Sequence, residues 1–253
     1  MKLHVEEHGH GETLLLHQGL GQGSWAWRYA APLFAERFRT VIFDTRGTGL
    51  SPVPDEPYDI ADLAADAADI LDGRAAHVVG FSMGGYVALT LALARPELVR
   101  SLVLAGTGAG GPERVPRPDH VRETFEAAAH LPLEEARRLA MPLTFSPGWT
   151  EANPERFDEI VAATLVRATP RQTIEAHTAA CLGFYEQALE VERVAAPALV
   201  VHGAEDVVVP VENGRMLAGR LPSARYVELP GLGHNLMLEA PEEFVEVVLD
   251  FLG

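Results

Sequence analysis

The sequence predicts an α/β protein with a mostly parallel sheet flanked by helices. Short apolar runs rich in β-branched residues recur along the chain, and segments with helical periodicity separate them. Continuous apolar runs of this kind are typical of strands that are buried on both faces of a parallel sheet. One of them, His77 to Val79, leads into Gly80-Phe81-Ser82-Met83-Gly84, and a helix-favouring segment follows until Pro96.

Composition narrows the class of protein. A chain of 253 residues with 47% apolar side chains can bury a full core, and α/β folds of this length often form one domain. The formal charge of −16 argues against a nucleic-acid partner and against binding to an anionic membrane. The single cysteine, Cys181, excludes an internal disulfide and is expected to be a small buried hydrophobe.

The N-terminus carries no sign of a targeting segment. Residues 1–8 lack the apolar stretch of a signal peptide, and no apolar run is long enough to span a bilayer. We therefore expect a soluble cytoplasmic protein.

The first part of the chain predicts two strands and a glycine-rich loop. Residues 3–7 alternate as an edge strand does, His8 to Gly11 form a turn, and Thr13 to His17 form a buried strand. The loop from Gln18 to Ser24 lacks the Lys-Ser/Thr of a phosphate-binding loop, and its glycines do not have the dinucleotide spacing. Neither nucleotide-binding motif therefore fits this loop.

A third strand, Arg39 to Asp44, precedes a second glycine-rich loop. We expect this loop to be structural, with Asp44 and Arg46 pairing with loop backbone and with each other. Residues 58–71 then predict an amphipathic helix whose aspartates are solvated.

The segment around Ser82 predicts a strained turn. A strand, Gly-x-Ser-x-Gly and a helix in succession are the context in which this motif forms a nucleophile elbow, and both glycines are needed because a Cβ would collide with neighbouring backbone. Ser82 would stand at a helix N-terminus, where backbone N–H groups favour negative charge. The alternative is a plain turn with a packing serine.

After the strand Arg100 to Gly106, the β/α rhythm stops. Residues 112–190 contain only helix-like segments, which cover 119–130, 133–140, 154–168 and 171–182. An apolar pocket under them is expected to involve aromatic side chains, although such residues often form a small core of their own. The candidates for substrate contact are Phe145, Trp149, Phe184 and Tyr185.

The last part of the chain returns to strand and helix. Ala198 to His202 and Arg225 to Leu229 predict strands, and residues 212–221 and 242–252 predict helices. Two acids, Glu205 and Asp206, follow the first of these strands. A glycine-rich loop with His234 follows the second.

Together these motifs resemble the α/β-hydrolase superfamily. The elbow, the run Asp44-x-Arg-Gly-x-Gly-x-Ser, the acid loop Gly-x-x-Asp-x-x-x-Pro and the Glu-Ala-Pro after the histidine loop occur in that family's order. The resemblance implies a triad of Ser82, Asp206 and His234, with Glu205 a solvated neighbour. An exchange of roles between these two adjacent acids is the alternative that the sequence leaves open. It implies a core of residues 1–111 and 191–253 and a helical cap, residues 112–190, inserted after strand six.

The resemblance also implies an oxyanion hole. In the family, the loop after the third strand begins His-Gly and supplies one backbone donor. Here Gln18-Gly19 takes that place, so Leu20 and Met83 would donate their N–H groups.

The expected activity is that of a carboxylesterase acting on a small, mainly apolar ester through an acyl-enzyme on Ser82, with no cofactor and no metal. Asp44-Thr-Arg-Gly resembles enol-lactone hydrolases, which makes a lactone an alternative substrate. Carbon–carbon bond hydrolases and cofactor-free haloperoxidases or perhydrolases use the same triad. A non-catalytic ligand-binding member of the fold is the alternative from another class, and a homodimer is compatible with the sequence.

Overall fold

The computed structural model describes residues 1–253 and is built on a seven-stranded sheet of order β1-β3-β2-β4-β5-β6-β7. Only β1 runs antiparallel to its neighbour. The carboxyl ends of the six parallel strands therefore share one edge of the sheet, where open α/β sheets bind ligands. The strands are β1 (Val5–His8), β2 (Thr13–His17), β3 (Arg39–Phe43), β4 (Ala76–Phe81), β5 (Val99–Ala105), β6 (Ala198–Gly203) and β7 (Ala224–Leu229).

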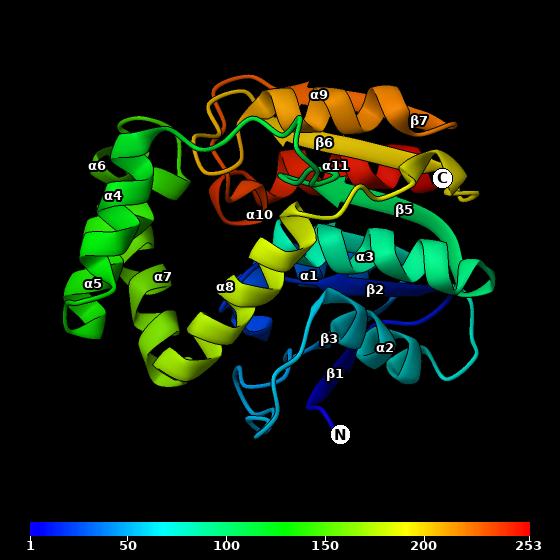
Figure 1. The fold of residues 1–253 in the computed structure, drawn as a ribbon, viewed down its shortest axis with the longest axis horizontal. Helices are drawn as coiled ribbons and strands as arrows, with labels where there is room; N and C mark the ends of the chain where they lie inside the picture. The colour runs from blue at the N-terminus through cyan, green and yellow to red at the C-terminus, as the bar shows by residue number, and fades with distance from the viewer.

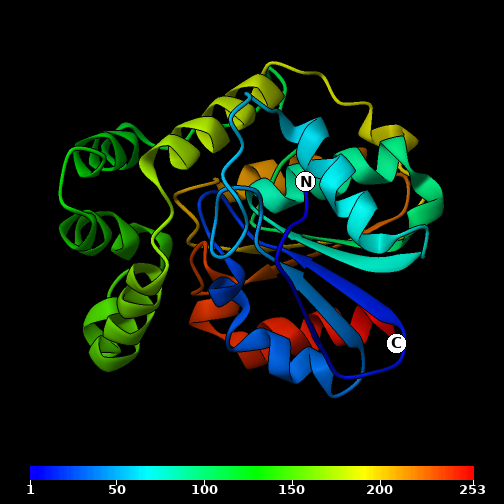
Figure 2. The same ribbon diagram turned by 90° about the horizontal axis from the view of Figure 1, so that it is seen from below.

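Helices cover both faces of this sheet (Figure 2). One face carries α2 (Ile60–Leu71), α3 (Met83–Ala94) and α9 (Val211–Arg220), and the other carries α1 (Ala30–Ala35) and α11 (Pro241–Leu252). The short helix α10 (Leu236–Glu239) precedes α11, and four 3₁₀ turns complete the set: Ser24–Trp27, Pro96–Leu98, Met141–Thr144 and Val191–Arg193.

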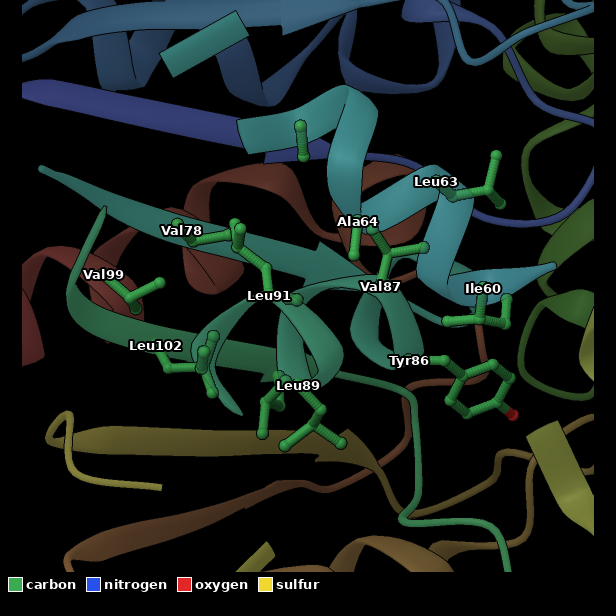
Figure 3. Close-up of a cluster of buried hydrophobic side chains, with 14 of the residues drawn as sticks. Ile60, Leu63, Ala64, Val78, Tyr86, Val87, Leu89, Leu91, Val99 and Leu102 are labelled. Atoms are coloured by element: carbon green, nitrogen blue, oxygen red, sulfur yellow. The ribbon is translucent and has the colours of Figure 1, made fainter. Parts of the chain in front are cut away.

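The two faces hold separate apolar cores because strand side chains alternate in direction. In β2, Leu15 belongs to the core under α2 and α3, while Leu14 and Leu16 belong to the core under α1 and α11. Figure 3 shows the first core, where Ile60 and Leu63 of α2 meet α3. Cys181 is buried in this core, as expected.

Residues 112–190, called the helical segment below, lie beside the sheet rather than on its faces (Figure 1). They contain helices and no strand, as the sequence predicts. The helices are α4 (Asp119–Ala128), α5 (Leu133–Ala140), α6 (Trp149–Ala152), α7 (Pro154–Val166) and α8 (Arg171–Tyr185). The last of them, α8, returns to the helix-covered sheet and packs against α2 and α3. None of the helices combines the length and the apolar character needed to cross a membrane.

The expected position of the segment after a sixth strand is one strand too high. Only five strands precede it in this chain, so it follows β5. The count came from the family's numbering, in which the loop after β2 follows the third strand.

The loop after β3 also differs in one contact from the prediction. Asp44 accepts hydrogen bonds from the amides of Ser24 (2.7 Å) and Leu50 (2.8 Å), as expected of a loop-stabilising carboxylate. Arg46 does not pair with it. Its guanidinium makes two 2.7 Å hydrogen bonds to Asp66, which is buried on α2 instead of solvated. A helical wheel cannot show that a neighbouring loop will cover one of its polar positions.

Candidate active site

The turn at Ser82 has the strained backbone of a nucleophile elbow. Ser82 has φ 53° and ψ −117°, a conformation that residues with a side chain rarely adopt. A Cβ on Gly80 would lie 2.3 Å from the carbonyl oxygen of Gly84, and a Cβ on Gly84 would lie 2.3 Å from that of His17. Both glycines are therefore required for the close approach of strand and helix, as the motif predicts.

Contacts with β5 anchor this turn. The Ser82 amide donates to the carbonyl of Ala105 (2.9 Å), and the Thr107 hydroxyl donates to the carbonyl of Ser82 (2.9 Å). The Ser82 side chain is half-buried at the first turn of α3. Its hydroxyl thus sits at the carboxyl edge of the sheet on a rigid support, next to the Met83 amide, the second predicted oxyanion donor.

Asp206 and His234 form a buried pair at the same edge. Nδ1 of His234 lies 2.7 Å from Oδ2 of Asp206. Because a carboxylate only accepts hydrogen bonds, Nδ1 carries the proton and Nε2 of the neutral ring is a free base. Glu205 is exposed, whereas Asp206 is buried, so of the two acids only Asp206 contacts the His234 ring.

The Asp206 carboxylate is saturated with donors. Its Oδ1 accepts from the amides of Val208 (2.8 Å) and Val209 (2.9 Å). Burial alone would raise the pKa of Asp206, but attraction to and hydrogen bonds from His234 and His202 hold that pKa well below its usual range. The group therefore stays ionised and can orient the His234 ring.

His202 is a further member of this cluster that is absent from the residues predicted from the sequence. This fully buried side chain at the end of β6 lies 3.1 Å from Oδ2 of Asp206 and 2.8 Å from the carbonyl of Val209, both measured from Nε2. Nε2–H therefore donates toward both oxygens. A histidine at the end of an otherwise apolar strand was the only available signal.

The ring of His234 lies against the end of β4. Its centroid is 4.8 Å from that of Phe81, the residue before Ser82. A Cβ on Gly106, just past the end of β5, would lie 3.2 Å from Nδ1 of His234. The imidazole thus lies beside the elbow, in space that a larger residue at position 106 would occupy.

The loop after β2 contains one backbone donor without a protein acceptor. The amides of Gly19, Gly21 and Gln22 all donate within the protein, whereas that of Leu20 does not. Gln18, which stands where the family has histidine, donates to the carbonyl of Phe43 (2.7 Å) and so closes the loop onto β3. The substitution preserves the loop and leaves the Leu20 N–H available.

The four aromatic residues predicted to contact substrate fall into two groups. Phe145 and Trp149 stack with their centroids 4.4 Å apart, and the backbone of Phe145 covers Gly233 in the histidine loop. Phe184 and Tyr185 instead pack around Tyr86 of α3, with Phe184 fully buried in the core. Only the first pair lies beside the loop that carries His234.

The polar side chains near this edge show no grouping suited to a metal: no three His, Cys, Asp or Glu residues are arranged to hold one. The site consists of a serine, a buried carboxylate–imidazole pair and backbone N–H groups.

Comparisons with known proteins agree with this architecture. A sequence model described as the alpha/beta hydrolase fold matches residues 12–241. The chain is 32% identical over 251 residues to "Putative carbamate hydrolase RutD" of Caulobacter segnis, covering 95% of this chain and 91% of that protein. It is 31% identical over 266 residues to the 2-hydroxy-6-oxononadienedioate/2-hydroxy-6-oxononatrienedioate hydrolase of Paraburkholderia phymatum, covering 100% and 91%.

A solved structure resembles the whole chain. The enol-lactonase from Burkholderia xenovorans LB400 superposes with a TM-score of 0.84 at 26% identity, covering 99% of this chain and 96% of that one. Since the family's sequence pattern spans nearly the full length and its fold is present, the chain belongs to the alpha/beta hydrolases.

Proposed function

We propose that the chain is a serine hydrolase that cleaves a carboxylic ester of a small, mainly apolar substrate through an acyl-enzyme on Ser82. The observation that carries the proposal is the buried Asp206–His234 pair (2.7 Å), whose imidazole lies beside the strained turn that presents Ser82. A serine hydroxyl needs such a base because it is a weak nucleophile at neutral pH.

The reaction would begin when Nε2 of His234 takes the Ser82 proton as Oγ attacks the ester carbonyl carbon. Asp206 stabilises the imidazolium that forms. The negative oxygen of the tetrahedral intermediate meets the N–H groups of Leu20 and Met83, and the loss of one such donor typically costs about 2.7–4 kcal/mol.

Collapse of the intermediate breaks the carbon–oxygen bond, and His234 gives its proton to the leaving alcohol. A water molecule then loses a proton to His234 and attacks the acyl-enzyme. The second tetrahedral intermediate releases the carboxylic acid and returns the proton to Ser82. The stacked Phe145 and Trp149 would form an apolar wall beside the histidine loop.

The relatives favour a second candidate within the same chemistry. They are named for carbamates, enol-lactones and a carbon–carbon bond substrate. An enol-lactone is an ester closed into a ring, and the loop Asp44-Thr-Arg-Gly also favours it. A panel of p-nitrophenyl esters, an enol-lactone, an aryl carbamate and a meta-cleavage diketone, ranked by kcat/KM, separates these classes.

The first test concerns the nucleophile. Ser82→Ala is expected to abolish hydrolysis of p-nitrophenyl acetate while leaving the unfolding midpoint of the protein close to that of the wild type. A fluorophosphonate probe should label the wild type at one site per chain and leave the variant unlabelled.

Two results would overturn the proposal. Residual turnover in the alanine variant at the wild-type rate would show a different nucleophile. A folded wild-type protein that neither hydrolyses esters nor reacts with the probe would be a ligand-binding member of the fold.

A further inference from the structure

The helical segment holds the loop that carries the Leu20 donor. The amide of Gly21 donates to Nδ1 of His177 (3.1 Å), a residue 156 positions away on α8. The Thr169 hydroxyl, just before the same helix, donates to the carbonyl of Gly21 (2.9 Å). Both backbone groups of this one glycine are thus bound to the helical segment.

Gly21 is at a position that only glycine fits. Its φ is +66°, and a Cβ would lie 2.2 Å from Cδ1 of Ile174 on α8. The side chain of Ile174 therefore lies against the loop backbone at Gly21, in the space that a Cβ would need. Thr169, Ile174 and His177 thus all contact this one residue through their side chains, so the position of α8 bears on the position of the loop.

The His177 ring is held in one protonation state. Its Nδ1 accepts a hydrogen bond, so the proton of the neutral ring resides on Nε2. Burial lowers the pKa of His177 to about 4, so the ring remains neutral at ordinary assay pH. The acceptor that Gly21 needs is consequently always present under those conditions.

Leu20 lies between two restrained glycines. On its other side, the Gly19 amide donates to the side chain of Gln22 (3.0 Å), and the Gln22 amide donates to the carbonyl of Gly19 (3.2 Å). Of these amides, only that of Leu20 has no protein acceptor. The hydrogen bonds of its two neighbours therefore restrain the Leu20 backbone while its N–H stays unengaged.

We propose that His177 is a positioning residue for the reaction: by accepting the Gly21 amide, it fixes the Leu20 N–H where an oxyanion forms. The inference rests on the proposed serine hydrolase function and adds the helical segment to the catalytic machinery. A donor displaced by about 1 Å can cost roughly a hundredfold in rate, so the contact has a kinetic consequence.

The test compares two substitutions with opposite effects on packing and hydrogen bonding. His177→Leu fills the space but removes the acceptor, whereas His177→Asn leaves a gap but keeps an acceptor oxygen near the place of Nδ1. We expect the leucine variant to lose about tenfold to a hundredfold in kcat with KM for p-nitrophenyl acetate changed less than about threefold. The asparagine variant should recover most of the rate.

Affinity for phenylboronic acid supplies a second readout, since its tetrahedral adduct with Ser82 places an oxygen in the oxyanion hole. The dissociation constant should rise in His177→Leu in parallel with the fall in kcat. His77→Leu is the matched control, because His77 hydrogen-bonds Ser101 (2.8 Å) at the opposite end of β4. It should leave both quantities unchanged.

The ranking of the two His177 variants by kcat decides the outcome. If leucine is more active than asparagine, or if only the unfolding midpoint changes, His177 serves packing alone and the proposal is wrong. Should His177→Leu fail to fold, His177→Met also removes the acceptor while filling the space, and kcat and boronate affinity equal to those of the wild type would overturn the proposal. A failure of the proposed serine hydrolase function would give a different result, because the wild type itself would then form no boronate adduct at Ser82.

Discussion

Asp206 and Glu205 are adjacent in the chain and have opposite surroundings. Asp206 is buried among four hydrogen-bond donors, and Glu205 faces solvent. In a triad the carboxylate acts by fixing the tautomer of the histidine and stabilising its charged form. Of the two acids, only Asp206 contacts the imidazole of His234.

Replacing these two acids gives a prediction at the residue scale. Asp206→Asn should lower kcat for p-nitrophenyl acetate by several orders of magnitude, because an amide can donate to Nδ1 and stabilise the wrong tautomer. Glu205→Gln should stay within about twofold of the wild type. The reverse order of activities would assign the carboxylate role to Glu205.

At the scale of elements, three long-range contacts join loops to helices. Arg46 joins the loop after β3 to α2, His177 joins α8 to the loop after β2, and Glu239 joins α10 to the helical segment. Each buries a polar group with a specific partner. The loss of one of these contacts should therefore cost more than the loss of a surface charge.

The pair between Arg46 and Asp66 makes a stability prediction. Asp66→Asn leaves the largely buried guanidinium without its carboxylate and should lower the free energy of unfolding by about 2–3 kcal/mol, while kcat of the folded protein is retained. Asp69→Asn, exposed on the same helix, is the control and should change stability by about 0.5 kcal/mol at most. Urea unfolding measures both, and equal effects would mean that the pair contributes nothing.

Glu239 makes a prediction for the histidine loop. Its buried carboxylate accepts from the amides of Gly233 (2.9 Å) and Ser146 (3.0 Å) and from the Ser146 hydroxyl. Glu239→Gln would place an amide donor against one of these donors, so kcat should fall along with stability as the loop carrying His234 loosens. Glu242→Gln, exposed on α11, should change neither. If Glu239→Gln lowers stability but leaves kcat at the wild-type value, the Glu239 contacts do not position the histidine loop for catalysis.

At the scale of the whole molecule, two buried neutral histidines make stability depend on pH. Burial lowers the pKa values of His17 and His177 from 6.5 to about 4. Between those pH values the unfolded chain binds more protons than the folded protein, so stability is complete above pH 6.5 and falls as the pH drops toward 4. Each group accounts for about 3 kcal/mol over that range. Asp206, with a lowered pKa, loses its contribution only below its unfolded value of 3.8.

The check is urea unfolding between pH 8 and pH 5. The wild-type free energy of unfolding should decline below pH 6.5, and His17→Leu should reduce the slope by about one proton. Identical slopes for the two proteins would show that His17 titrates alike in the folded and unfolded chain.

Local features of the site were predictable from the sequence. The turn at Ser82 follows from sterics within a few residues, since strand, paired glycines and helix leave one tight conformation. The preference for Asp206 over Glu205 rested on the resemblance in the acid loop, and in the structure Asp206 is the acid that contacts His234. The helix boundaries of the helical segment differed from the predictions by only a few residues because proline and periodicity mark helix ends.

The amino-acid sequence by itself determined the order of strands, elbow, acid and histidine, because each is encoded by short-range pattern and turn chemistry. Only the tertiary structure decided which distant groups meet: Arg46 with Asp66, His202 with Asp206, and His177 with Gly21. The physical reason is that such contacts depend on how packed elements align, and hydrophobic periodicity specifies which face is buried but not which polar group lies opposite it.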